Sequence, residues 1–311
     1  MTAYVLRRLL HGIPIILGVT IVTFILFHVF GGNPIASFLG KNATLADIAA
    51  MEKEYGFDKS LPLQYLDYLY QIIRFDFGRS FATREPVVDM IISGVGPSLS
   101  LTLPALLLTS LISVSIALVS AFFRGQLVDR LLVFLAVIGM SVSFLVYIVL
   151  GQYLLAFKLP LFQIHGYEAG FIDRWQYLSL PIIVMVVVGT GYDTRFYRSV
   201  MVEETTKDYI VTAFAKGLSR RRVMFVHMLK NASLPIITRM MISVPFLVTG
   251  SLLLESFFGI PGMGNMLLTA LDQADLPVIK AYTVVISILF VLSNITTDVL
   301  YAIFDPRVKL S

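Results

Sequence analysis

The chain of 311 residues contains no cysteine. This absence excludes disulfide bonds, cysteine-ligated zinc, iron–sulfur clusters and catalysis by a thiol. The four histidines (His11, His28, His165 and His227) lie far apart and form no H-E-x-x-H spacing. The sequence also lacks a G-x-x-x-x-G-K-[ST] stretch, so it has no nucleotide-binding P-loop of its own. We therefore predict a chain with no catalytic site, no metal site and no cofactor.

Charge is scarce as well, because only 14% of the residues are charged whereas 57% are hydrophobic. A soluble domain has about 25% charged residues, and the mean hydropathy here is +0.83. The composition predicts an all-α polytopic membrane protein, and the modest net charge of +4 indicates no nucleic-acid partner. Since a membrane-spanning helix needs about 20 mostly apolar residues, we predict six transmembrane helices. They are Leu9–Phe30, Ser98–Phe123, Leu131–Phe157, Trp175–Tyr192 continuing into Arg195, Ser233–Glu255 and Val278–Phe304.

The positions of lysine and arginine set the predicted orientation, because cytoplasmic loops contain an excess of both. With the N-terminus inside, the short outside loops hold only Lys158, Arg174 and Lys280. The inside segments hold most of the remaining basic residues, Arg220–Arg222 among them. Both termini are then cytoplasmic. The first apolar run exceeds the 7–15 residues of a signal-peptide core, so we expect it to be an uncleaved span.

These spans divide the chain into three predicted parts. Residues 1–30 form the N-terminal cytoplasmic end and first transmembrane helix, 31–97 an external helical loop, and 98–311 a five-helix transmembrane core. Within the external loop, Thr44–Asp47 has the form of a capping box for a helix that ends near Gly56. A second helix is predicted at Leu63–Arg74, and Pro97 is placed to begin the second span.

The core includes a polar cytoplasmic loop, 199–234, between the fourth and fifth spans. We expect Glu203 and Glu204 to lie in the first turn of a short helix, where negative charge favours the helix dipole. Gly217 would end that helix, Ser219 would cap a second one, and Pro235 would fit the first turn of the fifth span. A short helix of this kind needs a surface to pack on. Anionic lipid headgroups or a docked protein partner would both provide one.

The loop resembles the EAA-type coupling motif of ABC-importer permeases, in the variant of the dipeptide/oligopeptide/nickel branch. The residues that match are Asp208–Ile210, Thr212–Ser219, Arg221–Val223, His227, Lys230–Ala232 and Leu234–Pro235. Further segments that match are Leu6–Leu9, Tyr55–Lys59, Leu63–Tyr65, Asp76–Ser80, Glu255–Gly264 and Asp305–Arg307. The pattern departs from the family at Gly31–Pro34, where an acidic residue before proline is more usual, and it lacks the acidic residue of the general motif near Val211.

The resemblance implies a type I ABC-importer permease fold with a cytoplasmic coupling helix. It implies a second related permease subunit as a heterodimer partner, two ABC ATPase subunits, an extracytoplasmic solute-binding protein and a bacterial or archaeal cytoplasmic membrane. The expected ATPase-coupling residues are Asp208, Tyr209, Ile210, Ala213, Phe214, Lys216, Gly217, Leu218, Arg221 and Arg222. The expected residues of an external mouth are Glu255, Phe257, Phe258, Pro261 and Gly262.

The substrate stays open at this point. The branch includes peptide, nickel and glutathione systems, and we expect a translocation path for di- or oligopeptides with nickel or another small solute as the alternative. An ion-coupled secondary transporter is a further alternative, although such proteins usually place ionisable groups at mid-membrane. For Asp193, Arg195 and Arg198 we expect ordinary topology charges rather than gating ion pairs, and for Asp298 a structural bond within the bundle.

Overall fold

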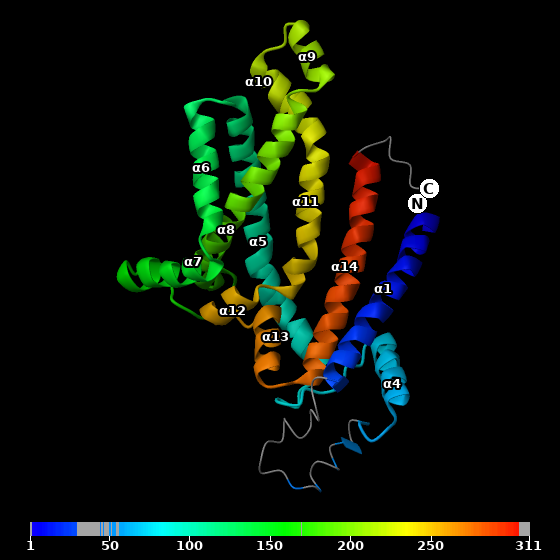
Figure 1. Ribbon diagram of the computed structural model, residues 1–311. Coiled ribbons are helices and arrows are strands. Elements are labelled where there is room, and N and C mark those ends of the chain that lie inside the picture. Colours follow the sequence, from blue (N-terminus) through cyan, green and yellow to red (C-terminus); the bar gives the residue numbers. More distant parts are fainter. Residues whose placement is uncertain are drawn as a thin grey trace.

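A computed structural model describes residues 2–29, 56–168 and 170–304, together with the single positions 44, 46, 50, 52 and 53. Over these residues the fold is a bundle of long helices with shorter helices at both ends (Figure 1). In lipid every backbone N–H and C=O must be satisfied within the protein, and a helix does this within one segment. The predicted capping box at Thr44–Asp47 and the matches at Gly31–Pro34, Tyr55 and Asp305–Arg307 lie wholly or largely outside the described residues.

Five described helices are long and apolar enough to cross a membrane. They belong to α1 (Thr2–Val29), α5 (Val87–Phe122), α8 (Phe171–Glu204), α10 to α11 (Arg220–Thr249) and α14 (Leu276–Phe304). Two bent helix pairs raise the number to seven if each counts as one span. The all-helical membrane architecture is therefore confirmed, and the predicted count of six lies between these numbers.

The third predicted span differs from the expectation of one straight helix. The chain instead forms α6 (Leu127–Ser141), which is bent by 89° from α7 (Phe144–Gly151) and the π-helical segment η1 (Gln152–Lys158). In Figure 1, α7 projects sideways from the bundle. Val142 is extended at the bend, and the Tyr147 hydroxyl donates to the Gly139 carbonyl at 2.9 Å, which fixes α7 against α6. Sequence hydropathy does not detect such a bend, because both segments are apolar.

Other helix ends also lie away from their predicted positions. The second predicted span begins at Val87 rather than at Pro97, because Pro86 precedes the helix in extended conformation and Val87 is fully buried. The helix predicted at Leu63–Arg74 is confirmed as α4 (Leu61–Arg74). Pro235 lies inside α11 (Leu229–Thr249), because α10 (Arg220–Arg222) and the π-helical segment η2 (Val223–Met228) continue directly into α11.

The short helices mark the two ends of the bundle. One end contains α9 (Asp208–Ala215) and α10, and we call it the α9 end; the beginning of α1 and the end of α14 point toward it (Figure 1). The opposite end contains α4 and α13 (Met263–Asp272), and we call it the α4 end. Between α11 and α13 lies α12 (Leu252–Phe258), and α12 and α13 are bent by 88°.

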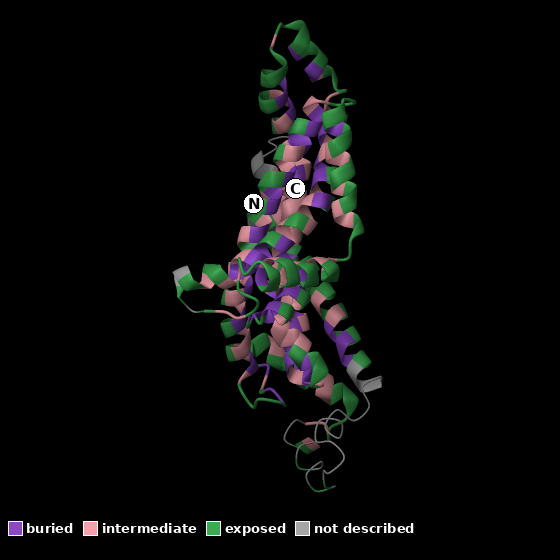
Figure 2. Ribbon diagram, turned by 90° about the vertical axis from the view of Figure 1, so that its left-hand side faces the viewer, coloured by how far each residue is buried: buried purple, intermediate pink, exposed green. Residues whose placement is uncertain are grey.

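Buried residues follow the interior of the bundle along its length, and exposed residues cover its outward surfaces (Figure 2). The buried hydrophobic residues form three clusters. The first joins α9 to α5, α8, η2 and α11; the second joins α5, α7, α8 and α12; the third joins α1, α4, α13 and α14. Many exposed side chains of α1, α5 and α6 are large and apolar, as expected for surfaces that face lipid.

A buried carboxylate fixes the segment between α4 and α5 to the start of α14. Asp275 is 2% exposed and accepts hydrogen bonds from the Ser80 hydroxyl at 2.5 Å and from the backbone N–H groups of Phe81 and Ala82 at 3.0 and 3.3 Å. Asp275, the residue just before α14, therefore fixes the position of residues 78–82.

We expect Asp275→Ala to destabilise the protein by about 2–4 kcal/mol, because three donors would lose a charged acceptor. Thermal unfolding of the purified protein in detergent measures the change. The matched control is Asp272→Ala, which removes an exposed carboxylate from the end of α13. Equal unfolding temperatures for the two variants would contradict this role of Asp275.

Candidate functional site

The α9 end consists of a short amphipathic helix seated on the ends of the long helices. Lys207 precedes α9 in extended conformation, Asp208 lies in its first turn, and Gly217 ends the segment with a φ of +78°. Only glycine adopts this left-handed conformation without strain. The predicted helix and its glycine stop are confirmed, whereas Glu203 and Glu204 lie in the last turn of α8 rather than the first turn of α9.

The two faces of α9 have different environments. Ile210 and Ala213 are 4% and 6% exposed and pack into the cluster that contains Tyr197 and Met201 of α8. On the other face, Val211 is 61% exposed and Phe214 is 46% exposed. An exposed apolar pair on a short helix at the tip of a bundle is typical of a helix that docks into a groove of another protein.

One hydrogen bond joins α9 to α8, and another closes the turn after α9. The Tyr209 hydroxyl donates to the Glu204 carboxylate of α8, and the Leu218 N–H donates to the Ala213 carbonyl at 3.3 Å. Burial, followed by the hydrogen bond to the neighbouring Glu204 carboxylate, raises the pKa of Tyr209 above its ordinary value. The helix is thus positioned by the chain itself, before any partner is present.

The ten residues expected to couple to an ATPase fall into three groups by exposure. Asp208, Phe214, Lys216, Gly217, Arg221 and Arg222 are exposed; Tyr209 and Leu218 are half-buried; Ile210 and Ala213 are buried. Since Ile210 faces the chain's own core, the exposed apolar surface of α9 is formed by Phe214 together with Val211. Val211 was not among the expected residues, although its place one residue after Ile210 puts it on the neighbouring face of the helix.

The three consecutive arginines are not equivalent. The Arg220 guanidinium donates to the Phe122 carbonyl at the end of α5 and lies 4.7 Å from the centre of the Phe122 ring. Arg221 and Arg222 are exposed, and the Arg222 N–H donates to the Ser219 hydroxyl at 3.5 Å, as predicted for a helix cap. Arg220 therefore attaches the loop to α5, and the other two provide positive charge at the surface.

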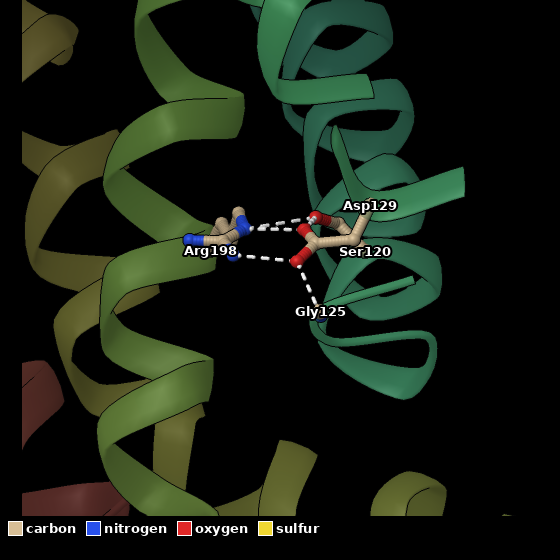
Figure 3. Close-up of polar contacts among 4 residues, drawn as sticks. All are labelled: Ser120, Gly125, Asp129 and Arg198. Carbon is tan, nitrogen blue, oxygen red and sulfur yellow. Dashed lines mark hydrogen bonds and ion pairs between the residues drawn. The ribbon is translucent and has the colours of Figure 1, made fainter. Parts of the chain in front are cut away.

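An ion pair fixes α8 to the turn between α5 and α6 near this end (Figure 3). Two nitrogens of the Arg198 guanidinium donate to the two Asp129 carboxylate oxygens at 2.7 and 2.8 Å. The Ser120 hydroxyl and the Gly125 N–H donate to the same carboxylate at 2.5 and 2.9 Å. The Asp129 side chain is 5% exposed, so the carboxylate is shielded from water, whereas the Arg198 side chain is 26% exposed.

We expected Asp193 and Arg198 to be ordinary topology charges. In the structure, each side chain also forms an ion pair with a residue of another helix. Asp193 of α8 binds Arg239 of α11 at 3.0 Å. Asp298 of α14 binds Arg8 of α1 at 3.0 Å, in agreement with the structural bond expected for it. Sequence inspection gave no partner for any of these residues, because the pairs join helices that are distant along the chain.

Glu255 lies in a different setting from the expected external mouth. It is on α12, is fully buried, and accepts from the Ser98 hydroxyl at 2.8 Å. It also accepts from the backbone N–H groups of Ser251, Gly264 and Asn265 at 3.1, 2.7 and 3.0 Å. The carboxylate therefore faces inward and closes the bend between α12 and α13 onto α5. The chain leaves α11 at Gly250, with a φ of +71°, so Glu255 does not end the fifth span.

The remaining residues expected at the external mouth are divided between core and surface. Phe258 is 1% exposed and Gly262 is buried, whereas Phe257 is 42% exposed and Pro261 is exposed. Of the five, Phe257 and Pro261 are the residues available to another molecule.

The sequence comparisons agree with this arrangement. The profile of the family described as "Binding-protein-dependent transport system inner membrane component" matches residues 113–310, and a companion N-terminal profile matches residues 1–102. The chain belongs to this family. It is the membrane component of an ABC importer, a class that works with ATPase and binding-protein partners.

Named relatives match over almost the whole chain. The glutathione transport system permease protein GsiC of Salmonella typhimurium is 34% identical over 99% of both chains. A putative peptide permease protein of Brucella suis is 34% identical over 100% of both chains. The oligopeptide transport system permease protein AppB of Bacillus subtilis is 33% identical over 99% of this chain and 100% of its own. The chain is similar to each of these permeases throughout its length.

We expect Asp129→Ala to lower the stability of this permease by about 3 kcal/mol, because it leaves the Arg198 guanidinium without its acceptor. The double variant Asp129→Ala/Arg198→Ala should lose less than the sum of the two single variants. Thermal unfolding in detergent measures all three, and Asp89→Ala, which removes an exposed carboxylate from α5, is the control. Additive losses would show that the two side chains do not act together.

We expect Gly264→Ala to destabilise the permease by about 1–3 kcal/mol. A Cβ at this position would lie 2.7 Å from the backbone of Ser251 and Leu252, so the bend held by Glu255 would have to open. Gly96→Ala is the matched control, since a Cβ there meets nothing within 4 Å. The same thermal measurement applies, and an unchanged unfolding temperature for Gly264→Ala would be evidence against a tight bend.

Proposed function

We propose that this permease forms the translocation path of a peptide importer and that α9 is its contact with an ABC ATPase. The observation on which this proposal rests is the exposed Val211 and Phe214 pair on a helix whose opposite side, Ile210 and Ala213, is buried in the chain's own core. The peptide substrate is supported by the names of the relatives, which are peptide, oligopeptide and glutathione permeases. Nickel as the cargo has only the sequence resemblance in its favour.

In this proposal the α9 end is cytoplasmic. Arg221, Arg222 and Lys216 are exposed there, which agrees with the excess of basic residues on the cytoplasmic side of membrane proteins. The start of α1 and the end of α14 point to the same end, so both termini would be cytoplasmic (Figure 1). The α4 end would face the solute-binding protein, with Phe257 and Pro261 of the 255–264 segment exposed for contact.

The working assembly would contain a second, related permease subunit and two ATPase subunits. This chain contributes no catalytic site, cofactor or metal in the proposal, so ATP hydrolysis belongs entirely to the ATPases. Closure of the ATPases would move α9, and α8 would transmit the movement. The Arg198–Asp129 pair would then move α5 and α6 together with α8, since it joins all three near the point where force is applied.

Phe214→Ala tests the proposed docking surface. We expect the variant to fold and assemble but to weaken ATPase docking by about 2 kcal/mol, because a half-exposed aromatic side chain would lose its groove. Because 2 kcal/mol corresponds to about thirtyfold in affinity, substrate-stimulated ATP hydrolysis by the reconstituted complex should fall by about that factor when the ATPase concentration limits docking. Phe134→Ala, which truncates a 61% exposed phenylalanine on α6, is the matched control and should have no effect.

Substrate-stimulated ATP hydrolysis at the wild-type rate in Phe214→Ala would contradict the proposed role of α9. Transport of a labelled peptide without nucleotide, driven by an ion gradient, would instead contradict the importer assignment for this complex. The two results are distinguishable, because the first concerns one helix and the second concerns the energy source.

A further inference from the structure

A lysine at the α4 end is surrounded by aromatic rings. The Lys280 ammonium lies 5.7 Å from the centres of the Phe24 and Phe57 rings and 5.4 Å from the centre of the Tyr68 ring. These rings come from α1, from the segment before α4 and from α4 itself, so three parts of the chain meet around one cation. Ring faces attract a cation, but they do not replace a counter-ion.

Within the described part of the chain, Lys280 forms no ion pair. Asp67 borders the same cavity, but its carboxylate binds the Lys59 ammonium at 2.5 Å. The Tyr68 hydroxyl is buried, with the residue 6% exposed, and it has no hydrogen-bond partner among the described residues. A buried donor without an acceptor destabilises the folded state, so both groups would gain from an anionic acceptor.

The cavity beside the Lys280 and Tyr68 side chains is small. A cavity of about 100 Å³ is bordered by Lys280, Tyr68, Gln71 and Arg79, and by the rings of Phe24 and Phe57. A water molecule takes about 30 Å³ of liquid, so the cavity has room for a group of roughly three or four heavy atoms. These four donor side chains, two of them cationic, outnumber the single carboxylate of the lining, Asp67, which is already paired with Lys59. Together with the aromatic wall they favour a compact anion with a flat shape.

We propose that this cavity binds a single carboxylate group that reaches it from the α4 end. A carboxylate has two oxygens, so in this proposal one would accept from the Lys280 ammonium and the other would lie toward the Tyr68 side chain, whose hydroxyl would turn to donate to it. The cavity admits the head group but not a large remainder, which would extend outward past α4. Either a free carboxylic acid or the C-terminus of a short peptide presents this group.

Acetate is the direct probe. The assembled complex in lipid nanodiscs would be unfolded thermally in chloride and in acetate, at constant pH and ionic strength. A ligand that binds the folded state raises the unfolding temperature, and we expect acetate to raise it by about 2 °C in the wild type. Acetate should also protect Lys280 from a small amine-acylating reagent, as mapped by mass spectrometry of the peptides.

Lys280→Met should abolish the rise in unfolding temperature that acetate causes. Tyr68→Phe should reduce it. Lys158→Met is the matched control, because Lys158 also lies near a tyrosine ring, at 5.8 Å, but is exposed; its response to acetate should equal that of the wild type. A general salt effect would appear in every variant, which separates it from binding. If Lys280→Met does not assemble, Tyr68→Phe still tests the site, since it removes only one hydroxyl.

Dialanine and dialanine amide distinguish the two sources of the carboxylate. Stabilisation by dialanine but not by its amide would support a site for peptide C-termini, and stabilisation by acetate alone would support a site for free acids. An acetate response that is absent in the wild type, or unchanged in Lys280→Met, would overturn the proposal. The test does not depend on ATP hydrolysis, so its outcome is separate from that of the importer assignment.

Discussion

The long helices are joined to one another by buried or half-buried carboxylates, each of which has donors from a different part of the chain. Asp129 joins α8 to the α5–α6 turn, Asp193 joins α8 to α11, and Asp298 joins α14 to α1. A charge in lipid is costly unless it is paired, so each carboxylate permits one arrangement of its neighbours. Apolar packing alone does not choose between rotations of a helix whose whole surface is apolar.

Toward the α4 end, two carboxylates also join separate elements, and neither has a basic partner among the residues that the structure describes. Glu255 and Asp275 bind hydroxyl and backbone N–H groups, and both are almost fully buried. They fix two irregular segments, the α12–α13 bend and residues 78–82, against α5 and α14. Buried backbone polar groups need hydrogen-bond partners within the protein, and these two side chains satisfy several of them.

This arrangement explains how a local contact at α9 would reach the bundle. The buried face of α9 belongs to one cluster with α5, α8, η2 and α11. Close-packed interiors transmit displacement rather than absorb it. A partner that binds the exposed Phe214 and moves α9 would therefore displace four other elements. At the opposite end, the aromatic rings around Lys280 join α1, α4 and α14, which places the proposed carboxylate site at a junction of the outer elements.

The sequence by itself determined the membrane class, five of the long helices and the helix, glycine turn and cap of the α9 segment. These follow from apolar runs and from local residue preferences, which need no knowledge of distant contacts. The resemblance in the same residues also identified the family.

Only the tertiary structure decided the bend at Val142, the start of α5 at Val87, the inward direction of Glu255 and the exposure of Val211 in place of Ile210. Each depends on a contact between residues of different elements, such as Glu255 of α12 with Ser98 of α5, or Ile210 of α9 in one cluster with Met201 of α8. Hydropathy cannot report such contacts, because a residue that faces lipid and a residue that faces another helix are equally apolar.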